Sequence, residues 1–312
     1  ADDQALDAAR KAEKAIVAGE ALGPLHGVPI AIKDLNGTKG LRTTMGSMLY
    51  KEYVPTADDV VVARIRQAGA IILGKTNTPE LGHSATTENM LGDACRNPWD
   101  TERTSGGSSG GAAAGLAAGM HPIAQGSDGG GSIRIPASMC GVYGIKPTQG
   151  RVPRNYAGAG GWGVFAQNGP ITRTVRDAAL LLQVMSGPYA DDPTAIQEPP
   201  PDFSAGLEVG VKGMRLGLSL DMGGAPVDPE VRSAVQEAAL AFEGMGASVE
   251  EATVKLDHER LKQAFSAIFY SDYAANFGDT YLKHRELVTP SFQRVMDKAI
   301  GWPASELSKA LR

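Results

Sequence analysis

Hydrophobic and polar positions in the N-terminal quarter of the chain switch between helical and strand periodicities. Apolar residues recur at helical spacing over 3–18, and again from an acidic cap at Asp58 or Asp59 to about 67. Alternation over 28–33 and the short apolar run 70–73 predict two strands, the first ending at Lys33. Strand, helix and strand in this order predict an α/β protein with partly parallel strands.

The same kind of pattern continues through the rest of the chain. A run of small residues over 109–119 predicts a tightly packed helix, and a capping box at 174–177 begins a second helix that runs to 185. A Pro-, Asp- and Glu-rich connection follows. A further strand–helix–strand pattern spans 215–254, and 256–312 is helical in pattern throughout.

Composition narrows the classes of function. The 312 residues carry a net charge of −5, which argues against a protein that neutralises nucleic-acid phosphates. No apolar run approaches the ~18 residues of a membrane span, and the first residues resemble no signal peptide. The two cysteines form no CxxC pair and weakly favour a reducing compartment, so a cytoplasmic location is expected. Without HExxH or a Cys/His cluster, no metal or other cofactor is expected.

Three familiar glycine motifs occur and lack their structural context. The segment 69–76 fits the phosphate-loop pattern, but its apolar middle favours a buried strand. No strand precedes the dinucleotide-like 158–163, and a polar turn precedes the GxSxG at 106–110. None of the five histidines lies in a motif, so a Ser-His-Asp triad has no support.

Three other segments, 23–34, 104–112 and 126–136, fit together as one site. Ser132 follows three glycines, whose N–H groups can converge on an oxyanion and stabilise it by roughly 3–4 kcal/mol per donor. A serine needs a base, and Lys33 can act as one if burial lowers its pKa from about 10.4. Ser108 would relay the proton. Taken singly, a solvated Lys33, a helix-capping Ser108 and a turn-ending Ser132 are each the simpler interpretation; their co-occurrence favours the site.

These segments resemble the amidase signature family, strongly over 22–148 and more loosely to about 254. Its hallmark is Gly-Gly-Ser-Ser-Gly-Gly followed by Gly-Ser-Asp-x-Gly-Gly-Ser-Ile-Arg-x-Pro. The resemblance implies a mixed twisted sheet covered by helices on both faces. It also implies one domain over 1–312, with a signature core at 22–187 and a peripheral part at 188–312.

The resemblance further implies roles for individual residues. Lys33 corresponds to the base, Ser108 to a bridging serine that follows a cis peptide bond, and Ser132 to the nucleophile. The remaining implied site residues are an oxyanion hole from the N–H groups of Gly129, Gly130, Gly131 and Ser132, supporting groups Asp128 and Arg134, and pocket residues Leu81, Gly82, Ser84 and Trp162.

Two departures from the family pattern matter. Gly129 stands where a side-chain-bearing residue, often Thr, is usual, so the hole is expected to be looser or to admit a bulkier substrate. Family members usually exceed ~400 residues, so a missing C-terminal part is expected, with one wall of the pocket.

The expected function is hydrolysis of a carboxamide through an acyl-enzyme on Ser132. The alternative is a glutaminase like the corresponding component of the tRNA-dependent amidotransferase, which Ile135 disfavours because that branch favours Gln there. A folded but inactive binding protein is the third interpretation. The expected partner is a small-molecule amide, with no nucleic acid and no membrane, and a homodimer is left open.

Overall fold

The computed structural model describes residues 2–155 and 165–312. Contacts group the chain into two compact units, Ala1–Phe203 with Tyr270–Trp302, and Ser204–Phe269 with Pro303–Arg312. The single domain expected over 1–312 stays a prediction.

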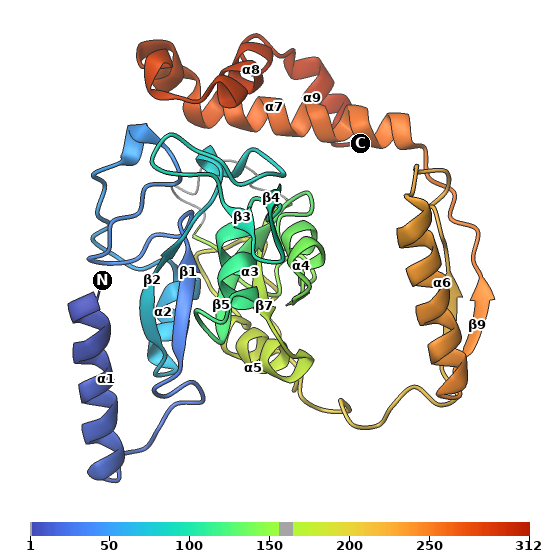
Figure 1. Ribbon diagram of the computed structural model, residues 1–312. Helices are drawn as coiled ribbons and strands as arrows, with labels where there is room; N and C mark the ends of the chain where they lie inside the picture. The colour runs from blue at the N-terminus through green and yellow to red at the C-terminus, as the bar shows by residue number, and fades with distance from the viewer. Residues whose placement is uncertain (1, 156–164) are drawn as a thin grey trace. The chain divides into compact units, whose positions relative to one another are not determined.

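The first unit is built on a mixed five-stranded sheet of order β2-β1-β5-β7-β6 (Figure 1). β1 pairs in parallel with β2 and β5, whereas β7 runs antiparallel to β5 and β6. The carboxyl ends of β1, β2 and β5 therefore meet at one edge, where β7 begins. The strand bounds are β1 Pro29–Lys33, β2 Ile71–Thr76, β5 Ile123–Asp128, β6 Tyr143–Gly144 and β7 Gln167–Thr172.

Helices cover both faces of this sheet, which confirms the predicted fold class. Successive strand residues point to opposite faces, and Ile123 and Ala124 accordingly lie in two different apolar clusters. The first cluster contains residues of α2 (Val60–Gln67) and α5 (Val175–Met185), and the second contains residues of α3 (Gly110–Ala117) and α4 (Arg134–Cys140). α1 (Asp2–Val17) contacts β2.

Small residues let α3 pack closely. A Cβ at Gly111 would lie 2.4 Å from the backbone N of Asn77, far inside van der Waals contact. This confirms that the small-residue stretch is a tightly packed helix. α3 leads directly from the loop that carries Ser108, so its packing fixes the position of that loop.

The acidic cap predicted for α2 is wrong in its chemistry. Asp59 occupies the N-cap position, but its side chain makes no capping bond. It instead accepts hydrogen bonds from the Gly37 N–H (2.9 Å) and from Asn36 (3.2 Å). The Val60 N–H donates to Asn155 Oδ1 at 2.6 Å, so a residue distant in sequence supplies the cap.

Several shorter elements complete the first unit. The Thr174 side chain caps α5 by accepting from the Asp177 N–H, as the capping box predicts. Thr289 caps α8 (Pro290–Ala299) by accepting from the Phe292 N–H. The shorter elements of the first unit are the hairpin β3 Arg96–Asn97 and β4 Asp100–Thr104, the 3-10 turns Met48–Tyr50, Glu80–Gly82 and Arg285–Leu287, and the helix α8 Pro290–Ala299.

The second unit contains the predicted strand–helix–strand. β8 (Arg215–Leu218) and β9 (Ser248–Glu251) pair in parallel, with α6 (Pro229–Gly244) between them in sequence. α9 (Ala304–Ala310) also belongs to it, and α7 (His258–Lys283) begins there and ends in the first unit. The pattern over 256–312 is therefore several helices separated by turns rather than continuous helix.

Candidate active site

Lys33 lies at the carboxyl end of β1 and is fully buried. Its Nζ donates to Ser108 Oγ at 2.7 Å and to Ser127 Oγ at 3.1 Å. Burial lowers its pKa from 10.5 to about 7, although the charge of Asp128 acts in the opposite direction. About half of such a lysine is neutral near pH 7, so this amine has the proton affinity that a general base needs.

Ser108 follows a cis peptide bond after Gly107 and is 2% exposed. The N-cap of α3 is Ser109, so the simpler interpretation of Ser108 as a helix cap is wrong. A Cβ at Gly107 would come within 2.9 Å of the backbone of Ser84 and Thr86. Glycine therefore lets the 84–86 segment approach the serine loop.

Ser132 lies close to this pair through the backbone. Its carbonyl accepts from the Ser109 N–H at 3.1 Å, which fixes Ser132 beside the residue that follows Ser108. The side chain is half-buried, and across 2–155 and 165–312 its hydroxyl makes no hydrogen bond. The hydroxyl is thus free to meet a substrate.

Asp128 organises the glycine loop before Ser132. The buried carboxylate accepts from the Gly131 N–H at 2.7 Å and from the Ile133 N–H at 3.1 Å, and forms a two-bond ion pair with Arg134. Burial alone would raise the pKa of Asp128, but these hydrogen bonds outweigh burial and lower it. Asp128 therefore stays ionised and holds the loop closed around it.

The same contacts change the predicted set of oxyanion donors. The Gly131 N–H already donates to Asp128 and is not available to a substrate oxygen. Within the described ranges, the N–H groups of Gly129, Gly130 and Ser132 have no acceptor. These three are the donors that the loop leaves free.

Ser127 and Gln125 belong to the site but were not found from the sequence. Ser127 accepts twice from Lys33, through its hydroxyl and its carbonyl, and the Gln125 side chain accepts from the Lys33 backbone N–H. Both lie on β5, two residues apart, so they share one face of the sheet. That alternation within the motif was the available signal.

A largely enclosed cavity of about 70 Å³ adjoins Ser127. Leu81 lines it in a left-handed conformation (φ 51°). The Leu81 N–H donates to Met45 O at 2.7 Å, and the Tyr273 hydroxyl donates to Leu81 O at 2.9 Å. These two bonds support a backbone that leucine otherwise avoids.

Gly82, Ser84 and Trp162 are the other residues predicted to line the pocket. A Cβ at Gly82 would be 3.6 Å from Ser108 Oγ, so Gly82 lies beside the site. The Ser84 hydroxyl pairs with Thr86 and does not line this cavity. Trp162 lies outside the described residues.

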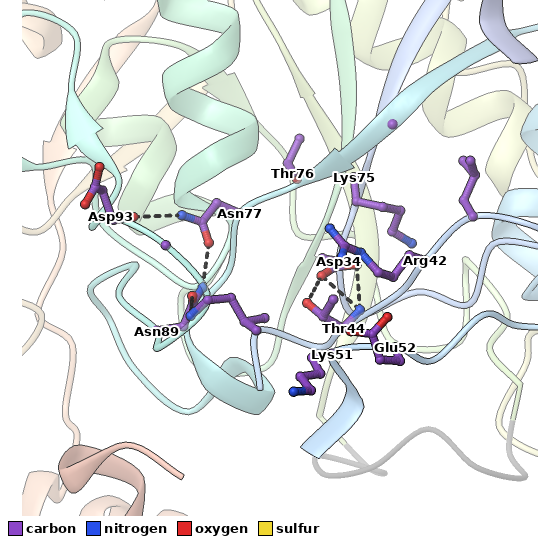
Figure 2. Close-up of a pocket in the computed structure, with 14 residues that line it drawn as sticks. Asp34, Arg42, Thr44, Lys51, Glu52, Lys75, Thr76, Asn77, Asn89 and Asp93 are labelled. Atoms are coloured by element: carbon purple, nitrogen blue, oxygen red, sulfur yellow. Dashed lines mark hydrogen bonds between the residues drawn. The ribbon is translucent and has the colours of Figure 1, made fainter. Parts of the chain in front are cut away.

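A second cavity, of about 640 Å³, opens at the ends of β1 and β2. Figure 2 shows Asp34, Thr44 and Arg42 on one side and Asn77, Asn89 and Asp93 on the other. Asp34 accepts from both the N–H and the hydroxyl of Thr44. Asp34 follows Lys33 directly but faces this other cavity.

The described part of the chain contains neither a cluster of metal-binding side chains nor a membrane-spanning helix. No group of His, Cys, Asp and Glu side chains there has the arrangement of a metal site. Nor does any described helix have the length and apolar character to cross a membrane.

Comparison with known proteins assigns the chain to a family. The family model described as "Amidase" matches residues 1–312. The chain belongs to the amidase family. An acylamidase from Rhodococcus erythropolis is 43% identical over 260 residues, which cover 83% of this chain and 54% of the relative.

Two other similar proteins are named as an amidotransferase subunit and as an aryl acylamidase. A glutamyl-tRNA(Gln) amidotransferase subunit of Moorella thermoacetica is 46% identical over 252 residues, covering 81% of this chain and 52% of that protein. A crystal structure of a bacterial aryl acylamidase of the amidase signature family superposes with a TM-score of 0.90 at 32% identity, covering 99% of this chain and 66% of that one. The chain thus spans about half the length of these curated relatives.

Proposed function

We propose that the protein hydrolyses the C–N bond of a small carboxamide through an acyl-enzyme on Ser132. The observation that carries this proposal is the 2.7 Å contact between Lys33 Nζ and Ser108 Oγ in a fully buried setting. A neutral amine that hydrogen-bonds to a serine next to a second, unbonded serine is the arrangement of an activated nucleophile.

The Lys33–Ser108 contact supports the second half of the proposed proton path, and the proximity of Ser132 to Ser109 supports the first half. Ser132 Oγ attacks the carbonyl carbon while its proton passes to Ser108 Oγ, and the Ser108 proton passes to neutral Lys33 Nζ. Collapse of the tetrahedral intermediate breaks the C–N bond, and the proton returns along the same path to the leaving nitrogen. Water then enters where the amine left and repeats the sequence, which releases the acid and restores Ser132.

The charge on the intermediate falls on the former carbonyl oxygen. The N–H groups of Gly129, Gly130 and Ser132 are the donors proposed to stabilise it, since Gly131 is engaged with Asp128. Each well-directed donor in such a site contributes roughly 3–4 kcal/mol to the transition state. Asp128 and Arg134 would act through the loop geometry rather than on the substrate.

Covalent labelling tests the proposal. A serine-directed fluorophosphonate is expected to modify the wild-type protein at Ser132, which mass spectrometry of the labelled peptide would locate. The Ser132→Ala variant should not react, whereas Ser84→Ala, a neighbouring serine outside the relay, should react normally. Unchanged labelling of Ser132→Ala would exclude this serine as the nucleophile.

A glutaminase that supplies ammonia to an amidotransferase is the second candidate. It is favoured by the 46% identity with the Moorella amidotransferase subunit. Glutamine hydrolysis that rises on addition of partner subunits and charged tRNA would support it, and efficient hydrolysis of simple amides without partners would favour the first candidate. A homodimer and a cytoplasmic location stay predictions; analytical ultracentrifugation and cell fractionation would test them.

A further inference from the structure

A chain of side-chain amides begins directly behind Lys33. Gln125 is wholly buried, and its Oε1 accepts from the Lys33 backbone N–H at 3.1 Å. Its Nε2 carries two N–H donors, which are shared among three acceptors, Asn168 Oδ1 and Asn36 Oδ1, both at 3.0 Å, and Gly126 O at 2.8 Å. The catalytic strand and the pocket wall are therefore joined by side chains that no step of the proposed mechanism uses.

The backbone partners fix the orientation of each amide. The Lys33 N–H can only donate and the Gly126 carbonyl can only accept, so the oxygen of Gln125 must face Lys33 and its nitrogen must face Gly126 and Asn168. Asn168 must in turn present its oxygen to Gln125. Its Nδ2, which carries two N–H donors, is not used in this network of amides.

Asn168 lies beside Ser127, a partner of Lys33 Nζ, on the wall of the 70 Å³ cavity. It pairs directly with Ser127 across β5 and β7, so the two side chains share a face of the sheet. Both line the 70 Å³ cavity. Asn168 is only 4% exposed, and in the described part of the chain its Nδ2 has no acceptor. Asn168 Nδ2 is not among the fully buried polar atoms without a partner, so it keeps access to the cavity that its residue lines and can donate to a molecule bound there.

We propose that Asn168 determines specificity by donating a hydrogen bond from Nδ2 to an acceptor atom in the acyl group of the substrate. This inference rests on the proposed amide hydrolysis. The acyl group is assigned to the enclosed cavity because it must remain bound while the amine leaves and water enters.

The cavity also limits the kind of acyl group. Its volume of about 70 Å³ has room for a short chain of a few non-hydrogen atoms. Met45, Leu81 and Phe277 supply apolar walls, and the carboxylate of Asp59 lies among the lining residues. The lining also carries the guanidinium of Arg154, so it holds one charge of each sign. A short, uncharged acyl chain that carries an ether, hydroxyl or carbonyl oxygen matches the apolar walls and the amide of Asn168.

A matched substrate pair tests this directly. The para-nitroanilides of methoxyacetic acid and butyric acid differ only by an ether oxygen in place of a methylene group. The ratio of their kcat/KM values is compared between wild type and two variants, so that the intrinsic reactivity of each anilide cancels. Asn168→Asp keeps the oxygen that accepts from Gln125 and removes both donors, and Asn168→Leu removes both functions.

We expect the preference for the methoxyacetyl substrate to fall roughly tenfold in both variants, the loss of one buried hydrogen bond. The control Asn276→Asp adds the same charge at an exposed position of α7 and should leave the ratio unchanged. An equal loss of kcat/KM for both substrates, with the ratio intact, would mean that Asn168 only supports the fold and would overturn the inference.

Binding measurements on a protein without the proposed nucleophile test the inference about Asn168 separately from the proposed hydrolysis. Affinities of both anilides for the Ser132→Ala protein are measured by titration calorimetry, with and without Asn168→Asp. If wild type hydrolyses neither compound but the tighter binding of the methoxyacetyl anilide depends on Asn168, the inference stands and the proposed hydrolysis fails. Equal binding, or no binding of either compound, overturns the inference.

Discussion

Two lysines lie at or next to the ends of adjacent strands of the sheet, and different groups surround their amines. Lys33 is fully buried and Lys75 is half-buried. Lys33 closes β1 and Lys75 lies one position before the end of β2, paired with Ile32 in the register. Burial lowers the pKa of Lys33 to about 7 and that of Lys75 to about 8. Desolvation is the larger cause in both, so burial alone does not distinguish a base from a structural cation.

The neighbouring groups make the difference. Lys75 Nζ donates to Asn36 O and to Thr38 Oγ1, while the charges of Asp34, Asp59 and Asp58 act to raise its pKa. Lys33 has one opposing carboxylate charge, Asp128, and donates to serine hydroxyls. Both amines donate to a hydroxyl, but the Thr38 hydroxyl donates onward to the backbone carbonyl of Asn36. The Ser108 hydroxyl beside Lys33 instead precedes Ser109, whose N–H bonds to the carbonyl of the proposed nucleophile Ser132, so we expect only Lys33 to serve as its base.

Replacing each lysine by alanine gives the largest expected contrast. Lys33→Ala should lower the rate of acylation by about 10⁴-fold, because the serines lose their proton acceptor. Lys75→Ala, with no contact to either serine, should lower it less than about tenfold. Single-turnover kinetics with both proteins checked for native circular dichroism would measure this, and similar losses in the two variants would break the comparison.

Changing the opposing charge at Lys33 should shift the pH dependence of the reaction. Below the lysine pKa, log kcat/KM should fall by about one unit per pH unit, with the acid limb near pH 7 in wild type. Asp128→Asn removes the charge that raises the pKa of Lys33, so the limb should move to lower pH. The rate on the plateau should fall about 10²-fold, because Gly131 and Arg134 lose their carboxylate partner.

A limb that stays in place in Asp128→Asn would show that another group titrates. The Lys75→Ala variant is the matched control, since its limb should remain near that of wild type. A shifted acid limb in Asp128→Asn, together with an unshifted limb in Lys75→Ala, would identify Lys33 as the group that titrates. A general loosening of the loop would lower the rate without moving the limb.

The sequence predicts β1 and β2 of the main sheet, whose apolar patterns are local, but not β5, β6 and β7. Alternation up to Lys33 and the apolar run before Lys75 identify β1 and β2 without reference to their partners. The capping box of α5 is equally local. Local signals of this kind do not require knowledge of the tertiary structure.

The parts that were missed depend on contacts between distant segments. Asp59 bonds to Gly37 instead of capping α2, and Asn155 supplies the cap from 95 positions further along the chain. The engagement of Gly131 by Asp128 is short-range, but it requires the loop geometry and not only the motif. Family resemblance could name Ser132 and Lys33, whereas the donors free for a substrate follow only from the structure.

The smallest expected effect is on the pH dependence of the free energy of unfolding, to which Lys33 and Lys75 should contribute over different pH ranges. Both lysines bind a proton more weakly when folded than when unfolded, so the unfolded chain holds more protons between the folded pKa and about 10.5. The free energy of unfolding should therefore rise with pH from about 7 through Lys33, and from about 8 through Lys75. Between pH 7 and pH 8, Lys33 should contribute a rise of roughly 1 kcal/mol. Urea titrations at the two pH values should show this rise in wild type and Lys75→Met and its loss in Lys33→Met; the reverse pattern would assign the lower pKa to the wrong lysine.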